Sequence, residues 1–173
     1  MYVAPGFATA AVVWAAIAVD ADLRARRIPN AVTGVGLVTA LVAHTLAGGR
    51  EGLVDAGSGA LVMGALLLPG WFLGWMGAGD VKLMAALGAW LGLGASWVAL
   101  VATLIAGGVI AVSVALRHHT LRRSLEGAAQ LAGWMVVGAG LGFAEPRTSG
   151  LRFPFAVSAL VGTLAAVFLP FGR

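Results

Sequence analysis

Long apolar runs, separated by short polar and charged clusters, make up nearly the whole chain. Most of these runs approach the length of about 20 residues that an α-helix needs to cross the hydrocarbon core of a bilayer. The pattern therefore predicts an all-α fold, a polytopic membrane helix bundle of about six transmembrane helices, built as one domain from residues 1–173. The expected spans are residues 3–19, 31–47, 56–75, 81–93, 97–116 and 153–169.

One further apolar run, residues 127–143, leaves two arrangements open. It is apolar enough to cross the membrane, but it is short and rich in Gly and Ala. It could equally lie in the interface plane as a helix with Arg123, Glu126 and Gln130 on one face. The distribution of Lys and Arg slightly favours the second arrangement. We therefore expect residues 117–152 to form a cytoplasmic or interfacial loop that contains a short helix.

The composition agrees with a chain whose main partner is the lipid bilayer. Of its 173 residues, 60% are hydrophobic and 10% are charged, and the mean hydropathy is +0.96. The net charge of +4 would suggest nucleic acid in a soluble chain. Here the basic residues gather in short loops such as 24–27 and 117–123, so we expect no nucleic-acid partner. The positive-inside rule places these loops in the cytoplasm and the N-terminus outside.

The types of side chain present narrow the possible chemistry. The chain has no cysteine, which excludes a disulfide framework, a zinc-thiolate module and a cysteine nucleophile. His44, His118 and His119 have no carboxylate or cysteine at ligand spacing, so we expect neither a metal site nor a cofactor.

The most unusual polar feature is Asp80, which follows Gly77 and Gly79 where an apolar run begins. A charged acid near lipid depth is costly unless it is paired, solvated or protonated, so its presence suggests a use. The two glycines allow backbone or substrate to come close.

A second acid is expected on the same side of the membrane, from the pair Asp20 and Asp22. These two residues lie about 200° apart around a helix, so they cannot both face one partner. Two carboxyl groups that approach closely share a proton and titrate as a unit. One then acts as a general base for water and the other as a general acid, which is the chemistry of aspartic proteolysis.

Simpler roles stay open for the same residues. Asp80 could cap the helix that it begins. Asp22 could be a solvated loop acid paired with Arg26 at i+4, and Asp20 is best explained by a role of that kind. Lys82 is expected to reach the interface as an anchor, or else to steady the Asp80 carboxylate.

A stop-and-restart signal, Ile28-Pro29-Asn30, separates the first two expected spans. Pro29 disfavours helix at Ile28, and Asn30 can cap the helix that follows.

Two motifs resemble the type IV prepilin peptidase family, whose members are membrane aspartic peptidases with a GxGD motif. The first motif runs from Asp22 through Ile28-Pro29-Asn30, and the second runs from Gly77 through Trp90. The resemblance implies that Asp22 and Asp80 are the catalytic pair, with no cofactor. It also implies a substrate, a prepilin or pseudopilin whose short basic leader is removed at the cytoplasmic face of a prokaryotic inner membrane.

Two departures qualify the resemblance. The chain begins at its first span and lacks cysteines, so we expect a peptidase without the N-methyltransferase activity of bifunctional relatives, as in the short members that serve tight-adherence pili. Residues 151–158 stand where relatives begin the last span from the cytoplasmic side, which supports an interfacial 127–143. Phe155 departs from the family pattern there.

Two other classes of function stay open. Intramembrane acids also serve proton- or ion-coupled transporters, although such acids are expected near the bilayer midplane. A non-catalytic assembly factor of a pilus or secretion system would tolerate the loss of either acid. The oligomeric state is left open by the sequence.

Overall fold

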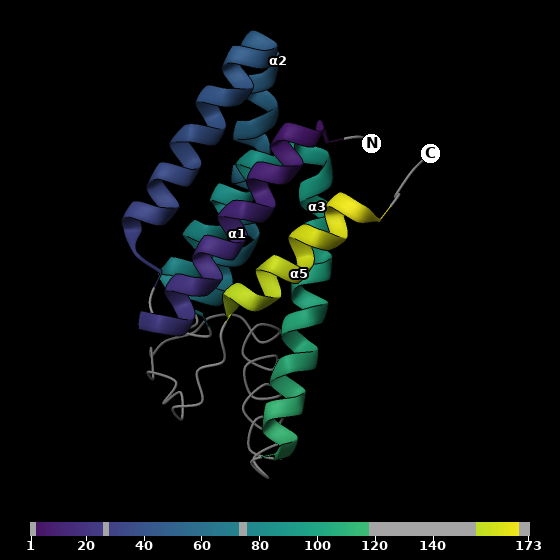
Figure 1. The fold of residues 1–173 in the computed structure, drawn as a ribbon. Coiled ribbons are helices and arrows are strands. Elements are labelled where there is room, and N and C mark those ends of the chain that lie inside the picture. The colour runs from purple at the N-terminus through teal and green to yellow at the C-terminus, as the bar shows by residue number, and fades with distance from the viewer. Residues whose placement is uncertain (1–2, 26–27, 73–75, 118–154, 170–173) are drawn as a thin grey trace, which may run out of the picture.

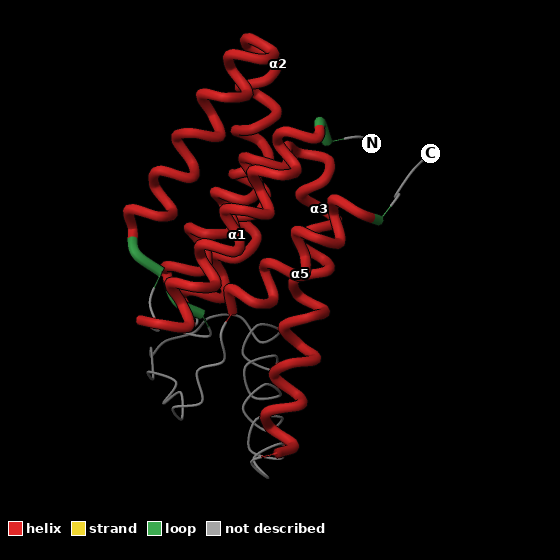
Figure 2. Tube along the Cα trace, viewed as in Figure 1, coloured by secondary structure: helices red, strands yellow, loops and turns green. Residues whose placement is uncertain are grey.

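The computed structural model describes residues 3–25, 28–72, 76–117 and 155–169, and within these ranges every regular element is a helix (Figure 2). This confirms the predicted all-α fold. The helices are α1 (Pro5–Ala25), α2 (Asn30–Phe72), α3 (Ala78–Arg117) and α5 (Phe155–Phe168).

Two glycines with positive φ fold the long helices α2 and α3 back on themselves. Gly49 (φ 58°, ψ −136°) interrupts α2, and Gly92 (φ 71°, ψ 171°) interrupts α3. Glycine adopts such angles without the steric penalty that other residues meet. Figure 1 shows α2 rising to the top of the view and returning. Gly49 lies between the expected spans 31–47 and 56–75, and Gly92 lies one residue before the end of the expected span 81–93. Helices α2 and α3 therefore each contain two of the expected spans.

Three described helices are long and apolar enough to cross a membrane, namely Pro5–Ala25, Asn30–Phe72 and Ala78–Val114. The shorter α5 is also apolar. How many helical segments cross the bilayer, and in which direction, stays a prediction. The expected loop 117–152 and the run 127–143 lie outside the described residues, apart from Arg117, which ends α3.

Some helix boundaries differ from those expected. Helix α1 continues to Ala25, so Asp20 and Asp22 are part of its last two turns and do not follow it in a loop. The break in α2 falls at Gly49, and the helix runs through Pro69 to Phe72. Pro69 has no N–H, so the carbonyl of Ala65 loses the helical hydrogen bond that residue 69 would otherwise donate.

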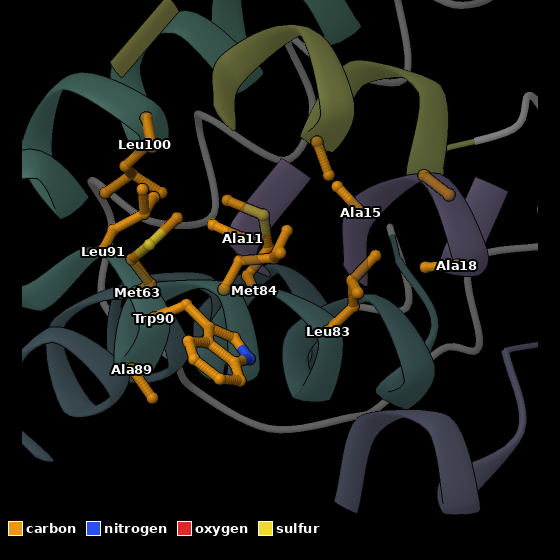
Figure 3. Close-up of a cluster of buried hydrophobic side chains, with 14 of the residues drawn as sticks. Ala11, Ala15, Ala18, Met63, Leu83, Met84, Ala89, Trp90, Leu91 and Leu100 are labelled. Carbon is orange, nitrogen blue, oxygen red and sulfur yellow. The ribbon is translucent and has the colours of Figure 1, made fainter. Parts of the chain in front are cut away.

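The core is built from small residues on α1 and larger ones on α2 and α3 (Figure 3). Four buried alanines follow each other at spacings of three and four along α1, which places them on one face. Gly59 of α2 and Gly88 of α3 meet backbone to backbone, and a Cβ on either would overlap the other's carbonyl. Close backbone contact of this kind is how helices associate in lipid. The four buried alanines of α1 are Ala8, Ala11, Ala15 and Ala18.

The outer surface of the described helices is apolar. Leu46, Leu61 and Ile105 are 83%, 72% and 63% exposed. In water such side chains would be buried, whereas in a bilayer they face lipid tails. Small residues inside and large apolar residues outside are the arrangement expected of a membrane bundle.

The break at Gly92 leaves backbone groups without their helical partners, and polar side chains take their place. The Leu93 N–H donates to Asp55 Oδ1 at 3.0 Å, and Ser96 Oγ donates to the Gly92 carbonyl at 2.6 Å. His44 Nε2 lies 3.3 Å from the Trp90 carbonyl. Because a backbone group without a partner is costly in an apolar environment, these side chains make the turn possible inside the bundle.

An aromatic cluster surrounds His44. Its ring stacks on Phe7 with centroids 4.0 Å apart, and Trp90 lies beside Phe7 and Trp14 at 6.4 and 6.5 Å. Trp90 is buried, with its indole beside aromatic residues of α1, while Trp97 is half-exposed.

Candidate active site

The C-terminal end of α1 and the N-terminal ends of α2 and α3 lie on the same side of the bundle, at the lower left of the packed helices in Figure 1. Asp22 lies in the last turn of α1, and Asp80 lies in the first turn of α3. Both side chains are half-buried. The fold thus brings the two predicted acids, 58 positions apart in the sequence, to the same end of the molecule.

Asp80 is oriented by the turn that begins α3. The Gly77 N–H donates to Asp80 Oδ2 at 3.1 Å, while the Asp80 N–H donates to the Gly77 carbonyl, also at 3.1 Å. This is the reach-back half of a capping box, in which an acid at the third helical position bonds the residue before the helix. The capping role considered for Asp80 is therefore present. Within the described residues Oδ1 has no hydrogen-bond partner, so capping leaves one oxygen free for chemistry.

Asp22 and Asp20 have different surroundings, as their positions on the helix predict. Asp22 is half-buried in the last turn of α1. Asp20 is exposed, and its Oδ1 accepts a hydrogen bond from Arg24 Nε at 2.7 Å in an i,i+4 ion pair. The simple role expected for Asp20 is confirmed. The alternative pairing of Asp22 with Arg26 falls outside the described residues.

The segment Ile28-Pro29-Asn30 lies against the start of α3. Lys82 Nζ donates to Asn30 Oδ1 at 2.9 Å, and a Cβ on Gly79 would be in van der Waals contact with Ile28 at 3.6 Å. One of the two expectations was that Lys82 steadies the Asp80 carboxylate. Lys82 instead donates to Asn30.

The predicted cap of α2 needs a correction. The Pro29 carbonyl accepts hydrogen bonds from the N–H groups of Val32 (3.0 Å) and Thr33 (3.4 Å). Pro29 therefore holds the cap position, and Asn30 is the first helical residue. The side chain of Asn30 is engaged by Lys82, which the local sequence pattern does not reveal.

The two glycines of the GxGD motif are not required by packing. A Cβ on Gly77 would come no nearer than 3.4 Å to Asp80 Oδ2, and a Cβ on Gly79 would touch Ile28 at ordinary distance. Neither residue has the positive φ of Gly49 and Gly92. Alanine would fit at both positions, so the folded chain by itself does not explain why glycine stands there.

Two polar residues that sequence reasoning missed, Asp55 and His44, support the turn at Gly92. The backbone partner of each residue is 38 or 46 positions away, so no local spacing reveals the contact. Within the described ranges no three His, Asp or Glu side chains gather closely enough to hold a metal ion.

These helices are those of a membrane protein, and they bring two carboxylates from separate helices to one end. The model of the type IV leader peptidase family matches residues 9–112, which is more than half of the chain and includes both Asp22 and Asp80. The chain therefore belongs to the type IV leader peptidase family.

Curated relatives give the same picture. The chain is similar to a prepilin leader peptidase/N-methyltransferase from Aeromonas hydrophila, with 33% identity over 154 residues, covering 79% of this chain and 52% of the relative. A protein of the same description from Aeromonas salmonicida (strain A449) is 32% identical with the same coverage. The chain spans about half the length of these relatives. No solved structure matches.

Proposed function

We propose that this chain is an intramembrane aspartic endopeptidase that removes the short basic leader from prepilin or pseudopilin precursors. The observation that carries the proposal is the juxtaposition of Asp22 and Asp80. Two half-buried acids from different helices, Asp22 in the last turn of α1 and Asp80 in the first turn of α3, lie at one end of the bundle. Membership of the type IV leader peptidase family and the curated prepilin peptidase relatives support the substrate class.

The reaction follows from the properties of a carboxylate pair. Two carboxyl groups that approach each other closely favour a state with one shared proton, because two like charges repel. The ionised member takes a proton from a water molecule, whose oxygen attacks the scissile carbonyl. The protonated member then gives its proton to the departing amine, and the peptide bond breaks. The proton taken from water restores the pair.

The turn before Asp80 contributes orientation. Because the Gly77 N–H holds Oδ2, the carboxylate has a fixed direction before substrate binds. Fixed direction reduces the entropy lost on reaching the transition state. The free Oδ1 is then the oxygen we assign to the reaction.

The place of the acids supports a peptidase over a transporter. Asp80 lies in the first turn of α3 and Asp22 in the last turn of α1, at helix ends and not midway along a span. A substrate that is apolar beyond its leader would keep its helix in lipid and present its cleavage point to this end of the bundle. We assign this end to the cytoplasmic face of a prokaryotic inner membrane, with the N-terminus outside, by the positive-inside rule.

We also propose that these residues cleave without methylating the product. In the bifunctional relatives that this chain resembles, N-methylation is associated with a cysteine-bearing region. None of this chain's 173 residues is cysteine.

The function is tested by incubating the purified full chain in detergent with a prepilin and following the leader by gel mobility and mass spectrometry. We expect one cut ahead of the apolar helix and a product with an unmethylated N-terminus. An intact prepilin would contradict the peptidase assignment. In vesicles, proton flux without cleavage would favour the transporter.

A further inference from the structure

A hydrogen bond joins the first turns of α2 and α3 beside the proposed site. Lys82 Nζ donates to Asn30 Oδ1 across 52 positions of sequence. Ile28, two residues before Asn30, lies over Gly79. Asp80 stands between Gly79 and Lys82, the two α3 residues that make these contacts.

We propose that Asn30 and Lys82 are positioning residues for Asp80. Their hydrogen bond holds the start of α3 in the rotation that turns the Asp80 carboxylate toward Asp22. This inference rests on the proposed function, because it assigns a role in the reaction of that same pair.

Helix geometry explains why Lys82 suits this task. Residues two positions apart project about 200° from each other around a helix, so Lys82 and Asp80 leave α3 on nearly opposite sides. A bond from Lys82 to α2 therefore fixes the side of α3 that faces away from the carboxylate. Rotation of the start of α3 would break this bond and change the direction of the Asp80 carboxylate.

The start of α3 needs such an anchor because its local sequence is weak. The residue before the helix is Gly77, which has no side chain to cap the first turn, and Gly79 has the low helix propensity of glycine. The first turn of a helix also lacks half of its backbone hydrogen bonds. The bond between Asp80 and Gly77 is local and moves with the turn, whereas the bond to Asn30 ties the turn to another helix.

The exposure of the pair separates positioning from stability. Lys82 and Asn30 are both exposed, so their side chains can bond water when they are apart. Exposed polar pairs contribute little to stability. A residue that only stabilises the fold would change the unfolding temperature, whereas a positioning residue changes the rate constant of cleavage while the protein stays folded.

The test measures kcat and KM for prepilin cleavage by the full chain in detergent, together with thermal unfolding. The variants are Lys82→Met, Asn30→Ala, their double mutant and Asn30→Asp, which keeps the acceptor. We expect each single substitution to lower kcat by up to about fivefold, because an exposed polar pair contributes at most about 1 kcal/mol to holding the carboxylate in place. KM and the unfolding temperature should stay unchanged. The double mutant should be no slower than the singles, because both remove one bond. Asn30→Asp should retain most of the rate.

Arg24→Gln is the matched control. It removes a basic side chain at the same end of the bundle, but Arg24 bonds Asp20 and not Asn30. It should cleave at the wild-type rate. Additive losses in the double mutant, a raised KM with normal kcat, or equal losses in Asn30→Asp and Asn30→Ala would overturn the positioning role. Asp80→Asn, measured alongside, separates the two proposals. If it cleaves normally, the proposed function fails. If it is inactive while Lys82→Met and Asn30→Ala are normal, only the positioning role fails.

Discussion

Asp55 on α2 accepts a hydrogen bond from the backbone N–H of Leu93 on α3 at 3.0 Å, at the turn where α3 reverses. This bond caps the second half of α3 with a side chain from another helix. It lies at the end of the α3 hairpin away from Asp80, whose first turn begins the same helix. One acid thus completes the fold at the far turn, while another is available for chemistry at the near end.

Asp55→Ala should therefore destabilise the protein without lowering kcat. Loss of a capping side chain costs about 0.5–2 kcal/mol. Thermal unfolding in detergent should show a lower midpoint, and prepilin cleavage below that midpoint should match wild type. Glu51→Gln is the control, because Glu51 is an exposed acid on the same helix. A large drop in kcat for Asp55→Ala would place Asp55 in the reaction and contradict this assignment.

Gly88→Ala should be the more harmful of two matched helix substitutions. Its Cβ would overlap the Gly59 carbonyl, and overpacking of this kind costs about 1–3 kcal/mol. Gly108→Ala adds a methyl group to the same helix where nothing lies within 4 Å. Since alanine favours helix by about 1 kcal/mol over glycine, Gly108→Ala should be neutral or stabilising. The comparison is made by thermal unfolding, and equal midpoints would show that α2 and α3 are not packed as closely as described.

Gly79→Ala should separate folding from function. The structure accommodates the methyl group at ordinary contact distance from Ile28, so the unfolding midpoint should stay within a few degrees of wild type, because a change below about 0.5 kcal/mol moves it little. We expect the cleavage rate to fall at least tenfold, because the added methyl group occupies space that an extended substrate needs beside Asp80. The measurement pairs cleavage kinetics with unfolding. Wild-type kinetics would mean that the room beside Asp80 is not used.

The sequence predicts the features of the fold that are local. The pattern of apolar runs predicts two spans within each of α2 and α3, and the helices are interrupted at Gly49 and Gly92, close to where one expected span gives way to the next. The two-residue separation of Asp20 and Asp22 predicts that only one of them faces the site, because helix geometry fixes their directions. The exposed ion pair of Asp20 with Arg24 agrees with this prediction for Asp20.

Contacts between distant helices could not be predicted in the same way. The bond of Lys82 to Asn30 and that of His44 to the Trp90 carbonyl each join residues more than 40 positions apart. The burial of Trp90 likewise depends on aromatic residues of α1 that are distant in the sequence. Such pairings depend on how helices pack, which the pattern of a single segment does not contain.

The central claim is that Asp22 and Asp80 form the catalytic pair. The most direct measurement follows leader removal in cells that co-express a cognate prepilin with wild type, Asp22→Asn, Asp80→Asn or Asp20→Asn. Asparagine keeps the shape of the side chain but can neither ionise nor supply an acidic proton. Immunoblots match the membrane levels of the variants. We predict that Asp22→Asn and Asp80→Asn leave the prepilin uncut, whereas Asp20→Asn cleaves it like wild type. Cleavage by Asp80→Asn, or its loss in Asp20→Asn but not in Asp22→Asn, would contradict the claim.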